Sequence, residues 1–202
     1  MTPVTPPSAP GLFGNDPVQV VDDAEGGIRY WPAFAAPAEA DAWYEALAEG
    51  VRWNAQRRQM YDRVVDVPRL LASWRIEALP PGLPLLDMLE RVRGVVPAPY
   101  NAVGLNLYRD GRDSVAMHND KLHTIIPGQP ITLVSLGDPR RMLVRAKEGA
   151  RERHAIDLVH GSLFSMSHAS QLTHEHGIPK TARAVGPRMS VVFRVRPVAH
   201  AD

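Results

Sequence analysis

The chain has 202 residues, of which 45% are hydrophobic, and this suits one compact domain with a buried core. It contains no cysteine, which excludes disulfides, zinc–thiolate sites and thiol nucleophiles, so a metal would have to be held by His, Asp or Glu. The formal net charge is +1, yet eight of the 22 acids and only one of the 23 Lys and Arg residues lie in residues 1–50. The basic remainder could hold a polyanion, or the acidic segment could simply neutralise it.

The N-terminal segment, residues 1–17, contains five prolines and few core-forming residues, and we expect a mostly disordered tail. Residues 18–202 are expected to form a single domain. No basic region followed by an apolar run opens the chain, and no stretch approaches the ~18 apolar residues of a membrane span. We therefore expect a cytoplasmic protein without membrane contact, and a monomer.

The first half of the domain, residues 18–98, begins with two predicted short strands around the turn "AEGG". Residues 36–50 are predicted to form a helix, because proline and acids lie near its start and Gly50 lies where it should stop. Residues 85–94 are predicted as a second helix from apolar residues at i, i+3, i+4 and i+7, with Gly94 as its C-cap.

From residue 99 to 197 the pattern changes to short strand-like segments separated by turn signals. The expected strands cover 102–110, 131–137, 140–146, 155–167 and 188–197. Many short strands at near-regular spacing are typical of a sandwich or barrel. We therefore predict an α+β, mainly β fold, in which a double-sheet, jelly-roll-like core is supported by two N-terminal helices.

A metal site is suggested by His118 and Asp120, which share one face of an extended segment because side chains alternate along a strand. A His-rich segment with His168, His174 and His176 follows some 55 residues later. Two histidines and one carboxylate that leave positions open are typical of non-haem Fe(II) oxygenases. A zinc hydrolase remains the alternative metal site, and a salt bridge is the simplest explanation of the first pair.

Polar residues interrupt two of the predicted strands. Asn106 and Tyr108 share one face of the first, and Asn is depleted in strands, which suggests the wall of a polar cavity. Arg188, Ser190 and Arg194 share one face of the last, where the two arginines lie ~20 Å apart along the strand. They could hold the two ends of a small dianion, or one could bind an anion while the other organises the site. An exposed edge strand and an exposed basic face are the alternatives.

Between residues 100 and 196 the segments "NLYRDGRDSVAMHND", "ITLVSLGDPRRM", "HGIPK" and "GPRMSVVFR" follow one another in an order that resembles the AlkB family of Fe(II)/2-oxoglutarate dioxygenases. The resemblance implies a double-stranded β-helix with Fe(II) as metal, 2-oxoglutarate as cosubstrate and O₂ as oxidant. It makes His118, Asp120 and His176 the metal ligands. His176 is preferred because it carries the family's H-x-[aliphatic]-P pattern, and His174 is the alternative.

The same resemblance assigns roles to the polar strand residues. Asn106 and Tyr108 match the N-x-Y pair that contacts 2-oxoglutarate. Arg188 would pair with its distal carboxylate, Arg194 with the carboxylate near the metal, and Ser190 stands where the family can place an Asn. The activity implied is oxidative demethylation of N-alkylated bases in DNA, or RNA, with release of formaldehyde and succinate, as in repair of alkylation damage.

The prediction of the substrate depends on residues 51–75, in which arginines and aromatic residues are interleaved. This composition suits a nucleic-acid strand, with phosphates on arginine and a base stacked on a ring. The residues expected to contact it are Arg57, Arg58, Arg63, Arg69, Tyr61 and Trp74. The alternative is that the aromatic residues belong to the core and the arginines to a solvated face.

Two departures from the family pattern keep other functions open. After His118-x-Asp120 the chain has Lys121, Leu122 and His123, where members acting on nucleic acids commonly have an acid. No Tyr-rich hairpin is evident after "VPRLLASW", residues 67–74. The alternatives are an oxygenase that acts on a protein side chain or a small molecule, and a non-enzymatic basic binding module.

Overall fold

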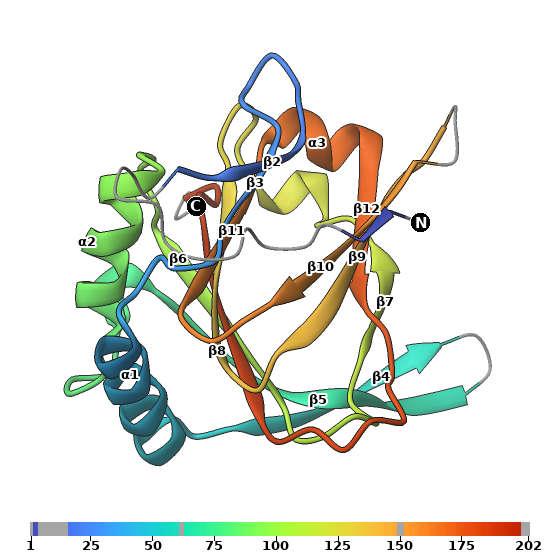
Figure 1. Ribbon diagram of the computed structural model, residues 1–202. Coiled ribbons are helices and arrows are strands. Elements are labelled where there is room, and N and C mark those ends of the chain that lie inside the picture. Colours follow the sequence, from blue (N-terminus) through green and yellow to red (C-terminus); the bar gives the residue numbers. More distant parts are fainter. Residues whose placement is uncertain (1, 4–15, 61–62, 149–151, 199–202) are drawn as a thin grey trace.

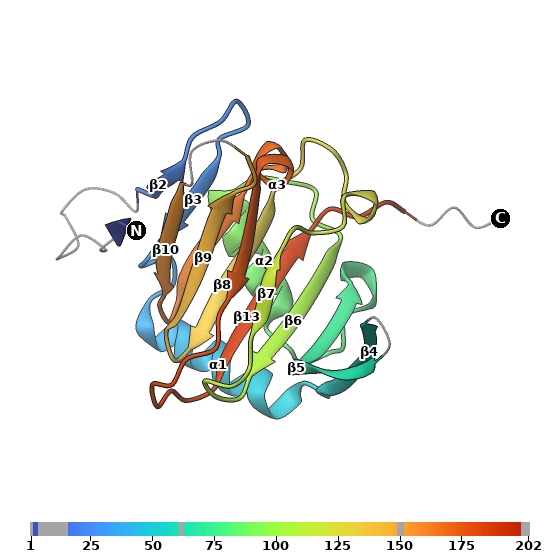
Figure 2. The same cartoon turned by 90° about the vertical axis from the view of Figure 1, so that its right-hand side faces the viewer.

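The computed structural model describes residues 2–3, 16–60, 63–148 and 152–198 (Figure 1). Two β-sheets face each other, and two helices cover the outer side of the larger sheet (Figures 1 and 2). This arrangement confirms the predicted mainly β, double-stranded β-helix core with two supporting helices.

The larger sheet has eight strands, and the smaller has five. In spatial order the larger contains β2 (Val18–Val21), β3 (Ile28–Trp31), β11 (Ser162–Met166), β8 (Ile131–Gly137), β13 (Arg188–Arg194), β6 (Ala102–Tyr108), β5 (Arg63–Arg75) and β4 (Asn54–Met60). The smaller contains β1 (Thr2–Pro3), β10 (Arg153–Leu158), β9 (Arg140–Ala146), β12 (His174–Ile178) and β7 (Val115–His118). All strand pairs are antiparallel except β1 with β10.

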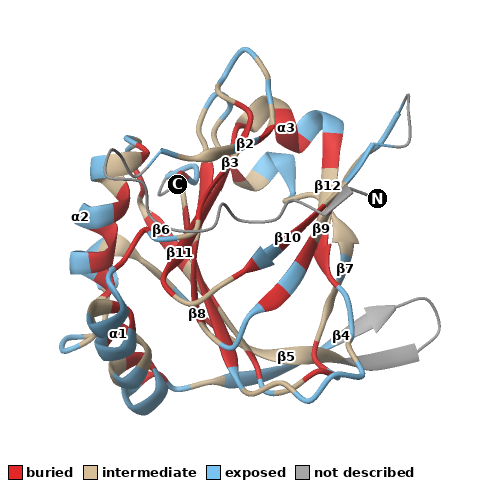
Figure 3. Cartoon of the chain, viewed as in Figure 1, coloured by how far each residue is buried: buried red, intermediate tan, exposed pale blue. Residues whose placement is uncertain are grey.

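The helices α1 (Pro37–Gly50) and α2 (Leu85–Val95) bury one face each, as their apolar spacing predicts. In α2 the four residues Leu85, Met88, Leu89 and Val92 are fully buried against the larger sheet (Figure 3). The prediction of Gly94 as C-cap is wrong. The helix continues to Val95, because Gly94 keeps a helical backbone rather than the positive φ of a glycine cap.

The cores on the two sides of the larger sheet differ. The cluster under the helices is built from large aliphatic and aromatic side chains, including Phe193 and Tyr100. A second cluster lies between the sheets and includes Ile156, Leu158 and Phe164. Because strand side chains alternate, each strand of the larger sheet sends one set of residues to the helices and the other toward the facing sheet.

Several elements were not among those predicted. β4 and β5 form a long hairpin at one edge of the larger sheet (Figure 2), and a short helix α3 (His168–Thr173) precedes the strand β12, which was not predicted either. The single strand expected over residues 155–167 is two strands, β10 and β11, which lie in different sheets. Of the predicted tail, residues 2–3 pair with β10, and residues 4–15 lie outside the described part of the chain. No helix among the described residues is long and apolar enough to cross a membrane.

Candidate iron and 2-oxoglutarate site

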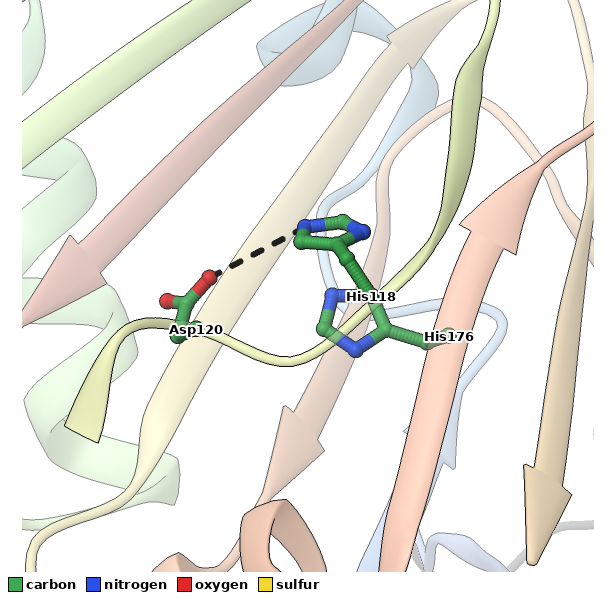
Figure 4. A group of neighbouring side chains, drawn as sticks. All are labelled: His118, Asp120 and His176. Carbon is green, nitrogen blue, oxygen red and sulfur yellow. Dashed lines mark ion pairs between the residues drawn. The ribbon is translucent and has the colours of Figure 1, made fainter. Parts of the chain in front are cut away.

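Three side chains converge between the sheets. His118 lies at the end of β7, Asp120 in the loop that follows, and His176 in β12 opposite His118 in the strand register. One ligand atom from each lies within 4.8 Å of the other two, and the two imidazole rings are 4.6 Å apart (Figure 4). The structure therefore brings together the three residues that the sequence nominated.

The imidazole of His118 has a defined tautomer. Its Nδ1 lies 2.9 Å from the backbone oxygen of Ala116, and because a carbonyl only accepts, Nδ1 must carry the proton. Its Nε2 faces Asp120, 4.0 Å from Oδ1 (Figure 4). The lone pair of Nε2 is thus directed into the group, which is how a backbone contact prepares a histidine for a metal.

The carboxylate of Asp120 is held in its charged form. Burial acts to raise its pKa, but the charge and hydrogen bond of Arg194, helped by His176 and His118, lower that pKa below its usual value. Its backbone N–H donates to Oε1 of Gln171 at 3.2 Å. Asp120 is therefore ionised at neutral pH and fixed at both its side chain and its backbone.

His176 is held in its neutral form. Burial, together with the neighbouring charge of His118, lowers its pKa to about 4. Its Nδ1 is buried and has no hydrogen-bond partner among the described residues. A neutral imidazole has a nitrogen lone pair that can coordinate a metal ion. His174 is buried apart from the group, with Nδ1 2.9 Å from the hydroxyl of Thr173.

The triad lies in the wall of a cavity of about 830 Å³ between the sheets. All five residues nominated for 2-oxoglutarate also line this cavity: Asn106, Tyr108, Arg188, Ser190 and Arg194. The strand register explains this, because β6 and β13 are neighbours and pair Arg188 with Tyr108 and Ser190 with Asn106.

Arg188 is fully buried at one end of this polar row. Its Nε donates to the hydroxyl of Ser135 at 3.0 Å, and its guanidinium lies over the ring of Tyr108, 5.2 Å from the centroid. Burial lowers its pKa to about 10, so it remains charged at neutral pH. Its Nη1 and Nη2 are buried without a partner among the described residues, and such a fork fits a carboxylate of a bound anion.

Asn106 is fixed from both sides. Its Oδ1 accepts a hydrogen bond from Nε of Arg69 at 2.8 Å, and its Nδ2 donates to the hydroxyl of Ser190 at 3.1 Å. The polar row along β6 and β13 is thus pre-organised, while the fork of Arg188 is left for a ligand. The donor set of two histidines and a carboxylate fits Fe(II), and the orphan fork fits 2-oxoglutarate.

Three site-supporting residues were missed from the sequence: Asn119, Ser135 and Gln171. Asn119 donates from Nδ2 to the backbone oxygens of Gln171 and His174. Gln171 is fully buried and touches both Asp120 and Met166. Asn119 could have been noticed, since it stands between two nominated ligands. The site residues that Ser135 and Gln171 contact, Arg188 and Asp120, lie 53 and 51 residues away in sequence.

The residues nominated for nucleic acid fall in different places. Arg57 is exposed on β4, and Arg69 lies in the cavity wall. Trp74 packs against the core under the helices, so it is not positioned to stack on a base in the cavity. The side chains of Arg58 and Arg63, and the whole of Tyr61, lie outside the described part of the structure.

The family model of the "2OG-Fe(II) oxygenase superfamily" matches residues 27–194, which include the complete triad and every described strand except β1 and β2. The human protein named "DNA oxidative demethylase ALKBH2" is 30% identical over 85% of this chain and 74% of its own length. The chain belongs to the AlkB family of 2OG-Fe(II) oxygenases. It is therefore an Fe(II)/2-oxoglutarate-dependent dioxygenase, with Fe(II) and 2-oxoglutarate as its cofactors.

Other AlkB relatives agree. The mouse "Alpha-ketoglutarate-dependent dioxygenase alkB homolog 3" is 30% identical over 83% of this chain and 65% of its own length. Among solved structures, "OsALKBH1" superposes with a TM-score of 0.57 at 16% identity, covering 83% of this chain and 97% of that one. A 2OG-Fe(II) oxygenase-family oxidoreductase from Burkholderia pseudomallei superposes with a TM-score of 0.59 at 15% identity, covering 83% and 84%. The two structures support the fold.

Proposed function

We propose that this AlkB-family dioxygenase oxidatively demethylates N-alkylated bases in DNA, or RNA, and so repairs alkylation damage. One observation carries the proposal: the cavity that holds the triad extends along the β4–β5 hairpin, which is built from the basic segment 51–75. The hairpin residues in its wall are Gln56, Val67, Pro68, Arg69, Leu71, Ala72 and Ser73. The human relative named a DNA oxidative demethylase supports the same substrate class.

In this proposal His118, Asp120 and His176 are the three protein ligands of Fe(II). The tautomer of His118 directs Nε2 to the metal, the depressed pKa of His176 keeps its imidazole neutral, and Arg194 keeps Asp120 ionised. Three protein ligands leave room for a cosubstrate and for O₂.

For 2-oxoglutarate, the fork of Arg188 pairs with the distal carboxylate, because its Nη atoms are buried and unmatched. Tyr108 and Asn106 contact the cosubstrate from the neighbouring strand, and Ser190 supports Asn106. Arg194 interacts with the carboxylate near the metal while it holds Asp120.

When bound, Fe(II) and 2-oxoglutarate supply the oxidation: O₂ is consumed, 2-oxoglutarate gives succinate and CO₂, and one oxygen atom enters a substrate C–H bond. A hydroxylated N-methyl group then loses formaldehyde and leaves the N–H of the restored base. The chain contributes placement, since its residues fix the ligands, neutralise the cosubstrate and enclose the methyl group.

The nucleic-acid strand is proposed to follow the β4–β5 hairpin, with Arg57 and Arg69 near its phosphates. Arg58, Arg63 and Tyr61, from the same basic segment 51–75, are proposed as further contacts. Trp74 contributes from the core, by holding β5 in place, rather than by stacking. Residues 18–202 are proposed to act as one catalytic domain, and as a monomer.

The test is turnover with a methylated single-stranded oligonucleotide after anaerobic loading of Fe(II) and 2-oxoglutarate. We expect restored base and formaldehyde in equal amounts, with succinate, and none of these above background in His118→Ala. Succinate in the wild type without base repair would instead indicate a protein side chain or small molecule as substrate. Succinate no higher than in His118→Ala would contradict the enzymatic proposal altogether.

A further inference from the structure

The charges in the cavity wall are strongly unbalanced. Among the described residues that line it, one carries a negative charge, Asp120, and this residue belongs to the triad. Five carry a positive charge: Arg69, Lys121, Arg188, Arg194 and Arg196. A substrate group that enters this cavity therefore meets cations.

Three of these five cations already have partners within the site or a role in binding 2-oxoglutarate. Arg69 hydrogen-bonds to Asn106 and to the backbone oxygen of Ser114, Arg194 pairs with Asp120, and the fork of Arg188 is assigned to 2-oxoglutarate. Lys121 and Arg196 remain. Within the described part of the chain, no hydrogen bond or ion pair engages the side chain of either one.

The two uncommitted cations line the same cavity as the triad, and both residues are exposed to solvent. Lys121 directly follows Asp120, and Arg196 follows Arg194 by two residues. The pKa of Arg196 is lowered, first by burial and then by the charge of Arg194, with Asp120 and Arg75 also close enough to act on it. Arg75 itself is held by the backbone oxygen of Pro197 at 2.7 Å.

Among the described residues that line the cavity, no acid other than Asp120 lies near to compensate them. Leu122, the second residue after Asp120, is 43% exposed and does not line the cavity. A base that carries a delocalised positive charge, such as 1-methyladenine or 3-methylcytosine, would meet like charges here without gaining an anion. A neutral base avoids this cost.

Hydrogen bonding selects further. Lysine and arginine side chains only donate, so they match a base edge that only accepts. In an N3-methylated pyrimidine dione the methylated nitrogen stands between two carbonyl oxygens, and each can accept one charge-assisted hydrogen bond. The corresponding edge of 3-methylcytosine carries an exocyclic nitrogen donor in place of one carbonyl.

We propose that Lys121 and Arg196 are specificity-determining residues that select a neutral N3-methylated pyrimidine dione, 3-methylthymine in DNA or 3-methyluracil in RNA, over cationic methylated bases. This inference rests on the proposed function and names its substrate class. The methyl group on N3 would face the triad while the two flanking carbonyls face the two cations.

The experiment compares kcat/KM for three single-stranded oligonucleotides of matched sequence, which contain 3-methylthymine (DNA), 3-methyluracil (RNA) or 3-methylcytosine (DNA). We expect one of the dione substrates to exceed 3-methylcytosine by at least roughly tenfold, the value of one charge-assisted hydrogen bond. The two dione arms distinguish DNA from RNA. Binding of the same oligonucleotides to enzyme loaded with Mn(II) and 2-oxoglutarate, without turnover, should show the same order.

The variants Lys121→Glu and Arg196→Glu should each shift the dione-to-cytosine ratio toward 3-methylcytosine by roughly fivefold or more. Lys180→Glu is the matched control, because Lys180 is exposed and outside the cavity wall, and it should leave the ratio unchanged. A wild-type preference for 3-methylcytosine would overturn the inference while leaving the demethylase intact. An equal loss on all substrates would also overturn it, since it would indicate phosphate contacts. Turnover of none of the three would overturn the proposed function, and the inference with it.

Discussion

Arg194 donates a hydrogen bond from Nε to Oδ2 of Asp120, across 74 residues of sequence. The two side chains are only 18% and 11% exposed, so the ion pair is largely shielded from water. Arg194 belongs to β13 of the larger sheet, and Asp120 follows β7 of the smaller one. The pair therefore ties the two sheets together at the metal site and keeps the carboxylate ionised in advance.

The metal ligands can be tested by deletion. His118→Ala and His176→Ala should lose Fe(II) binding and turnover, because each removes one of three protein ligands. His174→Ala is the matched control, since His174 lies outside the triad, and it should keep most of the affinity. Equilibrium titration with Mn(II) measures binding apart from activity. Loss of binding in His174→Ala but not in His176→Ala would show that the ligand assignment is wrong.

Arg188 should set the requirement for 2-oxoglutarate. Arg188→Met removes the buried fork, and the KM for 2-oxoglutarate should rise by roughly 10- to 150-fold, since a charge-assisted pair contributes about 1.5–3 kcal/mol. Saturating 2-oxoglutarate should raise the Tm of the metal-loaded wild type by roughly 5–10 °C, and that of the variant much less.

The same variant has an internal check on folding. Because Arg188 is buried with two unmatched nitrogens, its replacement by Met should leave the cosubstrate-free protein about as stable as the wild type. A large fall in unfolding free energy, measured with urea, would mean that Arg188 serves the fold rather than the cosubstrate.

Side-chain alternation predicted much of the site. It placed Asn106 and Tyr108 on one face of a strand and Arg188 and Arg194 on one face of another, and all four line one cavity. Alternation along one strand cannot predict how that strand aligns with its neighbours in the sheet. The pairing of Arg188 with Tyr108 and of Ser190 with Asn106 joins residues that are 80 and 84 positions apart, so it depends on the tertiary fold.

The misses have local causes. The β4–β5 hairpin was overlooked because Asp66 and Pro68 interrupt the apolar run of β5 and no glycine marks the turn. The one-and-a-half turns of α3 were too short for a helical period, although Ser167 caps them by accepting from the backbone N–H of Ser170. At Gly94 the tertiary packing of α2 overrode a common cap signal.

Asn119 should act as a positioning residue for the iron site. Its amide joins the ligand loop to the backbone of Gln171 and His174, just before His176. Asn119→Ala should weaken Mn(II) binding by on the order of tenfold, as loss of a supporting contact does. Asn54→Ala is the control, since Asn54 makes one exposed local hydrogen bond far from the site and should leave affinity unchanged. An equal loss of unfolding free energy without a change in metal affinity would contradict the positioning role.

Asp23 should make the stability of the fold depend on pH. Its carboxylate accepts from the hydroxyls of Ser167 and Ser170 and the N–H groups of Glu25 and Gly27, which together outweigh burial and lower its pKa. A lowered pKa stabilises the folded state above the unfolded value of about 3.9, and the effect is lost as pH falls below it. Asp23→Asn should therefore cost about 1–2 kcal/mol at pH 7, and the difference from the wild type should shrink between pH 5 and pH 3. Urea unfolding across this range measures it, with exposed Asp22→Asn as control. If the difference in unfolding free energy between the wild type and Asp23→Asn stays constant with pH, the charge of Asp23 does not stabilise the position of α3.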